Sequence, residues 1–308
     1  MRVALFGTPQ FAVPVLEAMI RDPETEVAAV VTQCDRPVGR KAVMTPPPIK
    51  TAAQQYQIPV LQIEKINREE SLEQLRALNC DLFVTAAYGQ ILSQKLLDIP
   101  PQGVVNVHAS LLPAYRGASP IAWSILCGDR ETGVTTMFTD AGMDTGDIIL
   151  QKRIPIEDTD TTQTLTEKLS LLGADLLIET LHGITEKTVP RIPQDPQKAT
   201  KTPILNKTHG KMDLSRTFRE LDCQIRAMTP WPGTWTMLDG KTLKIFEIRR
   251  VDGSGAPGTV LDDKLGIACG DGAFRPLEVQ LEGSKRMPLD VFLRGRKIEK
   301  GTVLGDEK

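Results

Sequence analysis

The chain has 308 residues, of which 41% are hydrophobic, so it is a globular protein long enough for two domains of about 100–200 residues each. Its net charge of −2 at pH 7 excludes a strong bulk attraction to nucleic acid or to an anionic membrane. The five cysteines contain no C-x-x-C pair, which argues against a disulfide framework and against a zinc site.

In the first part of the chain, short apolar runs alternate with helical segments, a pattern typical of parallel strands joined by right-handed crossovers. We predict strands at 2–6, 27–32, 82–87, 104–108, 132–138 and 148–154. We predict helices at 11–20, 49–57, 68–78, 118–126 and from 161 onward. The fold is therefore expected to be α/β, with a Rossmann-like, mostly parallel sheet. No G-x-G-x-x-G follows the first strand, so a nicotinamide cofactor is not expected.

Residues 33–50 contain Pro37, Gly39 and three consecutive prolines, a composition that predicts a long irregular loop. The loop has a single acidic residue, Asp35, and follows a predicted strand. Its basic residues are Arg36, Arg40, Lys41 and Lys50. One interpretation is a solvated connection. The position of the loop directly after a strand favours another interpretation, in which the loop is a basic flap at the ligand-binding edge of the sheet.

The last third of the chain changes in composition and in pattern. Residues 188–206 are rich in proline and lysine and are predicted to be a linker between domains 1–187 and 207–308. An amphipathic helix follows, and then short strands with an Asp239-Gly240 hairpin signal, which together indicate a small OB-like β-barrel. Residues 206–308 hold 18 basic against 15 acidic side chains, a balance that permits an anionic partner.

Two polar residues, Asn106 and His108, stand at the end of the apolar strand 104–108. Because they are two positions apart on a strand, they project from the same face. An amide can stabilise an oxyanion, and an imidazole can transfer a proton near neutral pH. The acidic loop 140–147 follows another predicted strand and could supply a carboxylate from Asp140, Asp144 or Asp147, among which the pattern does not choose. His182 and His209 are interpreted as structural.

The sequence has no G-x-S-x-G and no H-E-x-x-H, so we expect acid–base and oxyanion chemistry without a covalent enzyme intermediate and without a metal. The run from Asn106 to Gly117, together with Asp140-x-Gly142-x-Asp144-x-Gly146, resembles the 10-formyltetrahydrofolate-dependent formyltransferases. Four further motifs are similar to the methionyl-tRNA formyltransferases within that superfamily. They are Phe6-Gly7-Thr8-Pro9, Asp35-Arg36-Pro37-x-Gly39-Arg40, Ala87-Tyr88-Gly89 and Arg226-Ala227-Met228-x-Pro230-Trp231-Pro232-Gly233-Thr234.

The resemblance implies formyl transfer from 10-formyltetrahydrofolate to the α-amino group of initiator methionyl-tRNA. It assigns catalysis to Asn106, His108 and Asp144 in domain 1–187, and binding of the tRNA to the barrel 207–308. The residues it assigns to the folate are Tyr88, Gly89, Gln90, Ile91, Leu92, Ser110, Leu111, Leu112, Pro113 and Asp140. The residues it assigns to the tRNA are Arg36, Arg40 and Lys41.

We expect a cytoplasmic protein with no membrane partner, because no apolar run is long enough to span a bilayer and no signal peptide is seen. We also expect a monomer. One alternative is a formyltransferase that acts on a small amine such as a sugar nucleotide, for which the second domain would be dispensable. The other is a catalytically silent RNA-binding module, which is disfavoured because Asn106, His108 and Asp144 all stand at the motif positions.

Overall fold

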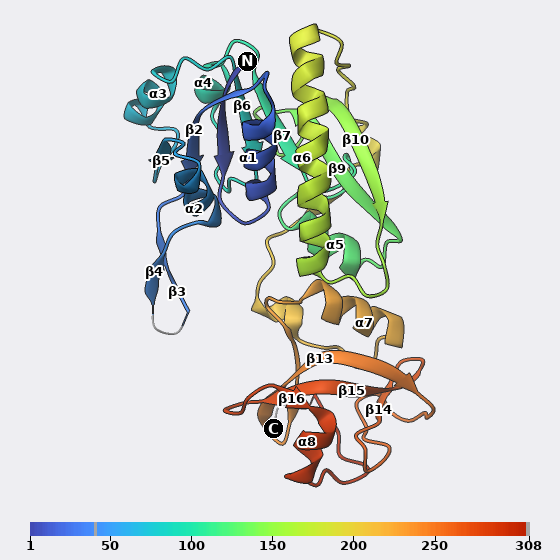
Figure 1. Cartoon of the computed structure of the whole chain (residues 1–308). Coiled ribbons are helices and arrows are strands. Elements are labelled where there is room, and N and C mark those ends of the chain that lie inside the picture. The colour runs from blue at the N-terminus through green and yellow to red at the C-terminus, as the bar shows by residue number, and fades with distance from the viewer. Residues whose placement is uncertain (40–41, 306–308) are drawn as a thin grey trace. The chain divides into compact units, whose positions relative to one another are not determined.

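The computed structural model describes residues 1–39 and 42–305 (Figure 1). The chain separates into two compact units. The first consists of Met1–Pro120, Glu131–Pro155 and Thr166–Thr202, and the second of Ile121–Arg130, Ile156–Leu165 and Pro203–Lys308. The linker and the domain boundaries expected from composition stay predictions. Within the described residues, no helix combines the length and the apolar character needed to cross a bilayer.

The first unit is built on a seven-stranded sheet with the order β10-β9-β7-β6-β1-β2-β5. The strands are β1 (Arg2–Gly7), β2 (Glu26–Thr32), β5 (Val60–Gln62), β6 (Leu82–Ala86), β7 (Val104–His108), β9 (Glu131–Phe138) and β10 (Ile148–Pro155). The five strands from β7 to β5 run parallel, whereas β9 and β10 are antiparallel to their neighbours. The Rossmann-like, mostly parallel sheet predicted from the sequence is confirmed.

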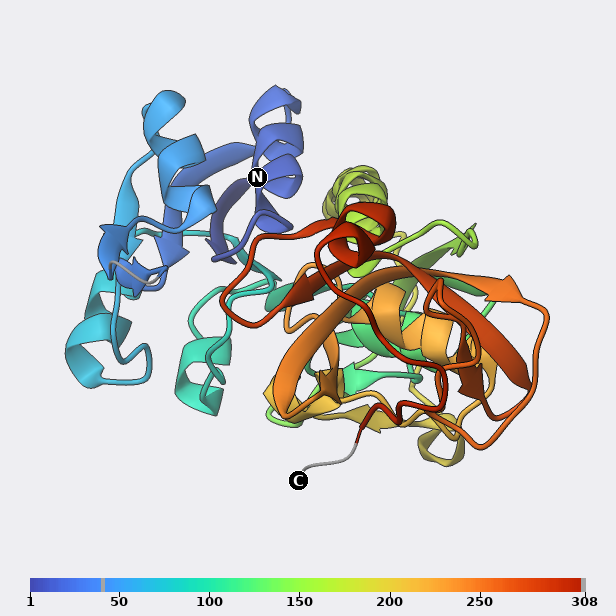
Figure 2. The same cartoon turned by 90° about the horizontal axis from the view of Figure 1, so that it is seen from below.

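Helices cover both faces of this sheet (Figures 1 and 2). They are α1 (Ala12–Arg21), α2 (Pro48–Gln55), α3 (Glu69–Arg76), α4 (Gln94–Leu97) and α6 (Thr162–Glu186), whereas α5 (Pro120–Leu126) belongs, apart from its first residue, to the second unit. Gly173 lets α6 approach the sheet closely, because a β-carbon there would lie 2.9 Å from Val107 of β7 and 3.4 Å from Val134 of β9. On the opposite face, leucines of α3 and α4 join one buried cluster with Phe6 and Phe83. These two layers hold the end of β7 in a fixed place.

The prediction that residues 33–50 are irregular throughout is wrong. Strands β3 (Arg36–Val38) and β4 (Val43–Thr45) form an antiparallel hairpin, which projects from the first unit in Figure 1. Pro37 is tolerated because a two-stranded ribbon has a free edge on each side, where a missing N–H costs no ladder bond. Pro48 stands at the first position of α2, where its N–H would be unpaired in any case. Arg40 and Lys41 lie outside the described residues.

The base of the β3–β4 hairpin is tied to the sheet by an ion pair. The ammonium of Lys50 donates to Asp35 at 2.9 Å and to Gln62 of β5 at 2.7 Å. Hydrogen bonds from Lys50 and Gln62 hold the pKa of the Asp35 carboxyl below its usual value. The carboxylate therefore stays charged, and the hairpin stem remains attached to the edge of the sheet.

The second unit contains an antiparallel sheet and several helices, which is compatible with the helix and small β-barrel expected at the C-terminus. Its strands are β12 (Thr234–Leu238), β13 (Lys241–Val251), β14 (Ile267–Cys269), β15 (Gly272–Leu281) and β16 (Met287–Pro288). Its helices of more than one turn include α7 (Phe218–Ala227) and α8 (Leu289–Arg294). Asp239 and Gly240 turn β12 into β13 with φ of 50° and 72°, as their hairpin signal predicts. The long strands curve in Figure 2, which is compatible with an OB-like barrel.

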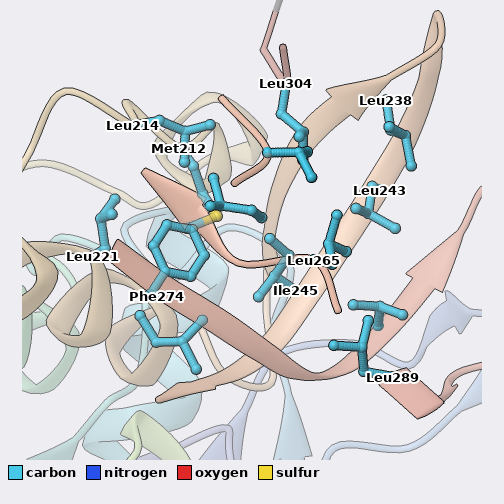
Figure 3. Packing of buried hydrophobic residues seen from close by; sticks show 14 of the residues in the cluster. Met212, Leu214, Leu221, Leu238, Leu243, Ile245, Leu265, Phe274, Leu289 and Leu304 are labelled. Carbon is cyan, nitrogen blue, oxygen red and sulfur yellow. The ribbon is translucent and has the colours of Figure 1, made fainter. Parts of the chain in front are cut away.

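A single apolar core holds the second unit together (Figure 3). Leu221 of α7, Ile245 of β13, Phe274 of β15 and Leu289 of α8 all contribute to it, and each is at most 7% exposed. The alternation of buried and exposed residues along β12 and β13 places one face of the sheet on this core. The unit therefore has its own hydrophobic core.

An ion pair joins α6 to the end of α1 in the first unit. His182 Nε2 lies 2.9 Å from Asp22 Oδ1, and Asp22 also accepts from the hydroxyl of Thr25 at 2.6 Å. The hydrogen bond to Asp22 raises the pKa of His182 above its ordinary 6.5. Burial opposes ionisation of Asp22, but the hydrogen bonds from Thr25 and His182 outweigh it and lower its pKa below the ordinary 3.8.

We expect this pair to make thermal stability depend on pH. A histidine whose pKa is raised on folding stabilises the fold below its unfolded pKa, and that contribution is lost as the pH rises through the folded value. The contribution of Asp22 is lost below its ordinary pKa. The loss of Tm caused by His182→Ala should therefore be larger at pH 5.5 than at pH 8.5 in scanning calorimetry. An equal loss at both pH values would contradict the pairing.

Candidate active site

Asn106 and His108 come from the last three residues of β7, and both side chains reach the same place, as their spacing predicts. The hydroxyl of Thr85, on the neighbouring strand β6, donates to Asn106 Oδ1 at 2.8 Å. The amide nitrogen of Asn106 is thereby left to face Asp144, where Nδ2 lies 3.4 Å from Oδ1. The amide is thus oriented with its N–H groups toward the acidic loop.

His108 is 7% exposed and is held by the turn that follows β7. Its Nε2 lies 3.0 Å from the carbonyl oxygen of Tyr115. Because a carbonyl can only accept, Nε2 carries the hydrogen, and Nδ1 is the nitrogen available for proton exchange. That nitrogen lies 3.7 Å from Asp144 Oδ1. The imidazole therefore turns its reactive edge toward the carboxylate.

Asp144 completes the group, and its carboxylate is fixed at both oxygens. Oδ2 accepts the backbone N–H of Gly117 at 2.8 Å, while Oδ1 lies between Asn106 and His108. The other two acids of the loop are engaged elsewhere. Asp140 accepts from the N–H of Gly142 and the hydroxyl of Thr145, and Asp147 lies 3.9 Å from Arg191. Of the three candidates, the structure brings Asp144 to the strand end.

The segment predicted to line the folate pocket begins with Tyr88, directly after β6. Its ring is 3% exposed and packs edge-on against Phe6, and this burial raises the pKa of its hydroxyl. Its carbonyl accepts from the hydroxyl of Thr8 and from the amide of Gln33, each at 2.9 Å. The ends of β1, β2 and β6 therefore meet at Tyr88, where the strand order reverses and where open α/β sheets bind ligands.

The next residues of this segment are arranged around a tight turn. Gly89 has φ of +85°, and a β-carbon there would lie 2.6 Å from the amide nitrogen of Gln33. Gln90 accepts from the N–H of Ile66 and donates to a carbonyl, so it fixes the turn. Ile91 is 77% exposed, whereas Leu92 is buried. The turn thus offers backbone and one exposed apolar side chain beside the edge of the sheet.

The second predicted folate segment runs from Ser110 to Pro113, with Leu111 partly exposed and Leu112 buried. Ser110 donates to the carbonyl of Ala114 at 2.7 Å. The N–H of Leu112 donates to the hydroxyl of Thr135 at 3.1 Å, and the Leu112–Pro113 peptide is cis. The segment is therefore bonded to β9 as well as to its own turn, directly after β7.

Of the residues predicted to contact tRNA, Arg36 is the one that lies within the described part of the chain. It is exposed on β3 and donates to the side-chain oxygen of Gln33, the same glutamine that bonds Tyr88. Three apolar side chains of the hairpin are also more than half exposed, namely Val38, Val43 and Met44. The hairpin therefore presents both a positive charge and apolar surface.

The arrangement can hold a carbonyl oxygen with the Asn106 amide and exchange a proton through His108 and Asp144. In the described part of the chain, no three His, Cys, Asp or Glu side chains form a metal site. The contributors that were not expected from the sequence include the hydroxyl of Thr85, the carbonyl of Tyr115 and the N–H of Gly117. A threonine within an otherwise apolar buried strand was the available signal for Thr85.

Comparison with known proteins gives consistent matches along the chain. Residues 1–181 match the family described as formyl transferase, and residues 204–297 match its C-terminal domain. The methionyl-tRNA formyltransferase of Citrifermentans bemidjiense is 48% identical over 308 residues, covering 99% of this chain and 96% of that protein. The one from Acetivibrio thermocellus is 46% identical over 311 residues, covering 99% and 100%.

Among solved structures, the sugar 3N-formyl transferase WlaRD, crystallised with dTDP and 5-N-formyl-THF, matches with a TM-score of 0.67. The match covers 92% of this chain and 99% of that one at 19% identity, and it shows that the two proteins share a fold.

Proposed function

Since the chain belongs to the formyl transferase family and, within it, to the methionyl-tRNA formyltransferases, we propose that its strand-end cluster transfers the formyl group. The donor is 10-formyltetrahydrofolate, and the acceptor is the α-amino group of methionyl-tRNA. The observation that carries the proposal is the place of Asp144 Oδ1, which lies 3.4 Å from Asn106 Nδ2 and 3.7 Å from His108 Nδ1.

The neutral amine of the methionyl ester attacks the formyl carbon, and negative charge develops on the formyl oxygen. Asn106 donates a hydrogen bond to that oxygen through Nδ2, because its Oδ1 is already engaged by Thr85. A fixed donor aimed at a developing oxyanion is worth about 10²–10³ in rate. His108, when protonated, adds a second donor through Nδ1.

The attack leaves a surplus proton on the amine, and the departing N10 of the folate needs one. His108 Nδ1 and Asp144 stand side by side at the end of β7 and relay this proton. The carboxylate of Asp144 stabilises the imidazolium that forms when the proton arrives. The N–H of Gly117 keeps the carboxylate in place throughout. No covalent bond to the enzyme is needed in this scheme.

The folate is proposed to bind along the turn after β6 and the turn after β7. The backbone from Tyr88 to Leu92, with the exposed side chain of Ile91, suits the flat edge and face of a pterin. Ser110 to Pro113 and the turn that Asp140 folds flank the other side. These residues fit a folate because they combine backbone hydrogen-bonding groups with an apolar side chain at the sheet's crevice.

The tRNA is proposed to contact the hairpin 33–50 and the domain 207–308, joined to the catalytic domain 1–187 by a linker at 188–206. Arg36 on the hairpin is exposed and suits a phosphate, and Arg40 and Lys41 are proposed to act with it. We propose further that the chain works as a monomer in the cytoplasm.

A direct test is formylation of charged initiator tRNA by the purified chain with 10-formyltetrahydrofolate as donor. Methionyl-tRNA should be formylated, and an amino sugar nucleotide offered at equal concentration should not. Preferential formylation of the sugar nucleotide would favour the alternative function instead. Formylation of neither amine would contradict both.

Arg36→Ala should raise the KM for methionyl-tRNA several-fold and leave the KM for the folate unchanged, because the hairpin would contact the tRNA backbone. The dependence of log(kcat/KM) on log salt should also become shallower by about one unit, as expected when one phosphate contact is lost. Arg76→Ala, which removes an exposed ion pair with Glu69 in α3, is the matched control. Equal KM values for tRNA in both variants would argue against the hairpin.

A further inference from the structure

Residues 194–202 form a strap that contacts both loops around the catalytic cluster. Its C-terminal part, β11 (Lys201–Thr202), pairs in parallel with β8 (Arg116–Gly117). The N–H of Tyr115 donates to the hydroxyl of Thr200 at 2.8 Å. The strap thereby holds the turn whose Tyr115 carbonyl accepts from His108 and whose Gly117 N–H donates to Asp144.

The other end of the strap grips the acidic loop. The amide nitrogen of Gln194 donates to the carbonyl of Asp144 at 2.9 Å and to the carbonyl of Gly146 at 2.8 Å. Asp144 has φ of +52°, a conformation that residues with a β-carbon rarely adopt. Such a conformation persists where the surroundings over-determine it. The two bonds from Gln194 act on the backbone of Asp144 itself and of Gly146, two residues further on.

Arg116 fixes Gln194 in turn. It is 7% exposed, and its Nε and Nη2 donate to the side-chain oxygen of Gln194 at 3.0 and 2.8 Å. With its oxygen engaged by two donors, the amide of Gln194 has one orientation, in which both of its hydrogens face carbonyls. Arg116 lies between Tyr115 and Gly117, so its partly buried contact with Gln194 couples the loop that holds His108 to the loop that carries Asp144.

We propose that Gln194 is a positioning residue for formyl transfer, because it holds the backbone that places the carboxylate of Asp144 beside His108. Arg116 in turn fixes the side-chain amide of Gln194. The inference rests on the proposed role of Asp144. A displacement of about 1 Å in a catalytic group can cost on the order of 10²-fold in rate, so loosening this loop should act on the chemical step. Gln194 acts on the acidic loop through the backbone carbonyls of Asp144 and Gly146, so its role is to position a catalytic group.

Two variants test this. Gln194→Glu can still accept from Arg116 but has no N–H for the two carbonyls, and Gln194→Met removes the donors without adding charge. Each should lower kcat about 10- to 100-fold and change the KM for the folate and for methionyl-tRNA by less than about 3-fold. His182→Ala, which removes an ion pair in the same unit, should lower Tm and keep the wild-type kcat.

A double-variant comparison separates positioning from general loosening. If Gln194 acts through Asp144, then Asp144→Asn with Gln194→Met should be no more than about 3-fold slower than Asp144→Asn alone. The inference would be overturned if the kcat losses of the two single variants multiplied in the double variant, or if both Gln194 variants kept the wild-type kcat. If Asp144→Asn itself retained the wild-type kcat, the proposed function and this inference would fall together. If Asp144→Asn were slow and the Gln194 variants kept the wild-type kcat, the inference about Gln194 would be wrong and the proposed function would stand.

Discussion

His108→Ala is expected to lower kcat for formyl transfer by about 10²–10³, because it removes both a donor to the developing oxyanion and the group that relays the proton. Single-turnover formylation of methionyl-tRNA measures this loss directly. The KM for the folate should change little, since the imidazole faces Asp144 and Tyr115. Circular dichroism should show the same secondary structure, because the ring fills one position at the end of β7.

The matched control for this experiment is His182→Ala, a histidine that pairs with an aspartate far along the chain from the cluster. It should keep the wild-type kcat. If His108→Ala were as fast as the wild type while folded, the imidazole would have no part in the reaction. If both histidine variants were equally slow, the loss would reflect stability rather than chemistry.

Gly146→Ala is expected to disrupt the acidic loop and to lower Tm by about 6–12 °C. A β-carbon at Gly146 would lie 1.8 Å from the carbonyl oxygen of Phe138 and 2.9 Å from its carbon. These atoms are backbone at the end of β9, so the loop must move to relieve the clash, at a cost of about 3 kcal/mol. Because the loop carries Asp144, kcat should also fall, in contrast to variants that destabilise other parts of the fold.

Gly295→Ala serves as the control, since a β-carbon there meets no atom within 4 Å. It should change Tm by less than about 2 °C, because surface substitutions away from special features change stability little. Thermal unfolding and formylation rates measured on both variants separate the two cases. A wild-type Tm and kcat for Gly146→Ala would contradict the close packing of the loop on β9.

Long periodic segments were predictable from the sequence, and the structure confirms them. Strand 104–108 has the expected bounds, since an apolar run reports burial directly. The shared face of Asn106 and His108 follows from the same periodicity. Asp144 could be chosen as the catalytic carboxylate only by resemblance, because the sequence does not show which of the three acids of this loop faces His108.

Other features depend on contacts that have no sequence period. The two-residue strands β8 and β11 are far apart in the chain and too short to show a pattern. The hairpin β3–β4 contains Pro37, which local propensity counts against a strand. Thr85 lies in a strand predicted to be apolar throughout, although its hydroxyl orients Asn106. Gln194 lies in a proline-rich segment that was predicted to be a linker, and its contact with the acidic loop has no sequence signal.

A crystal structure of the chain bound to 5-formyltetrahydrofolate would show directly whether the folate reaches the end of β7. We expect the folate to lie along the turns after β6 and β7, with its N10 within roughly 3–4 Å of Asn106 Nδ2 or of the His108 ring. A folate bound with N10 away from the end of β7, and with Asn106, His108 and Asp144 outside its binding site, would contradict this expectation.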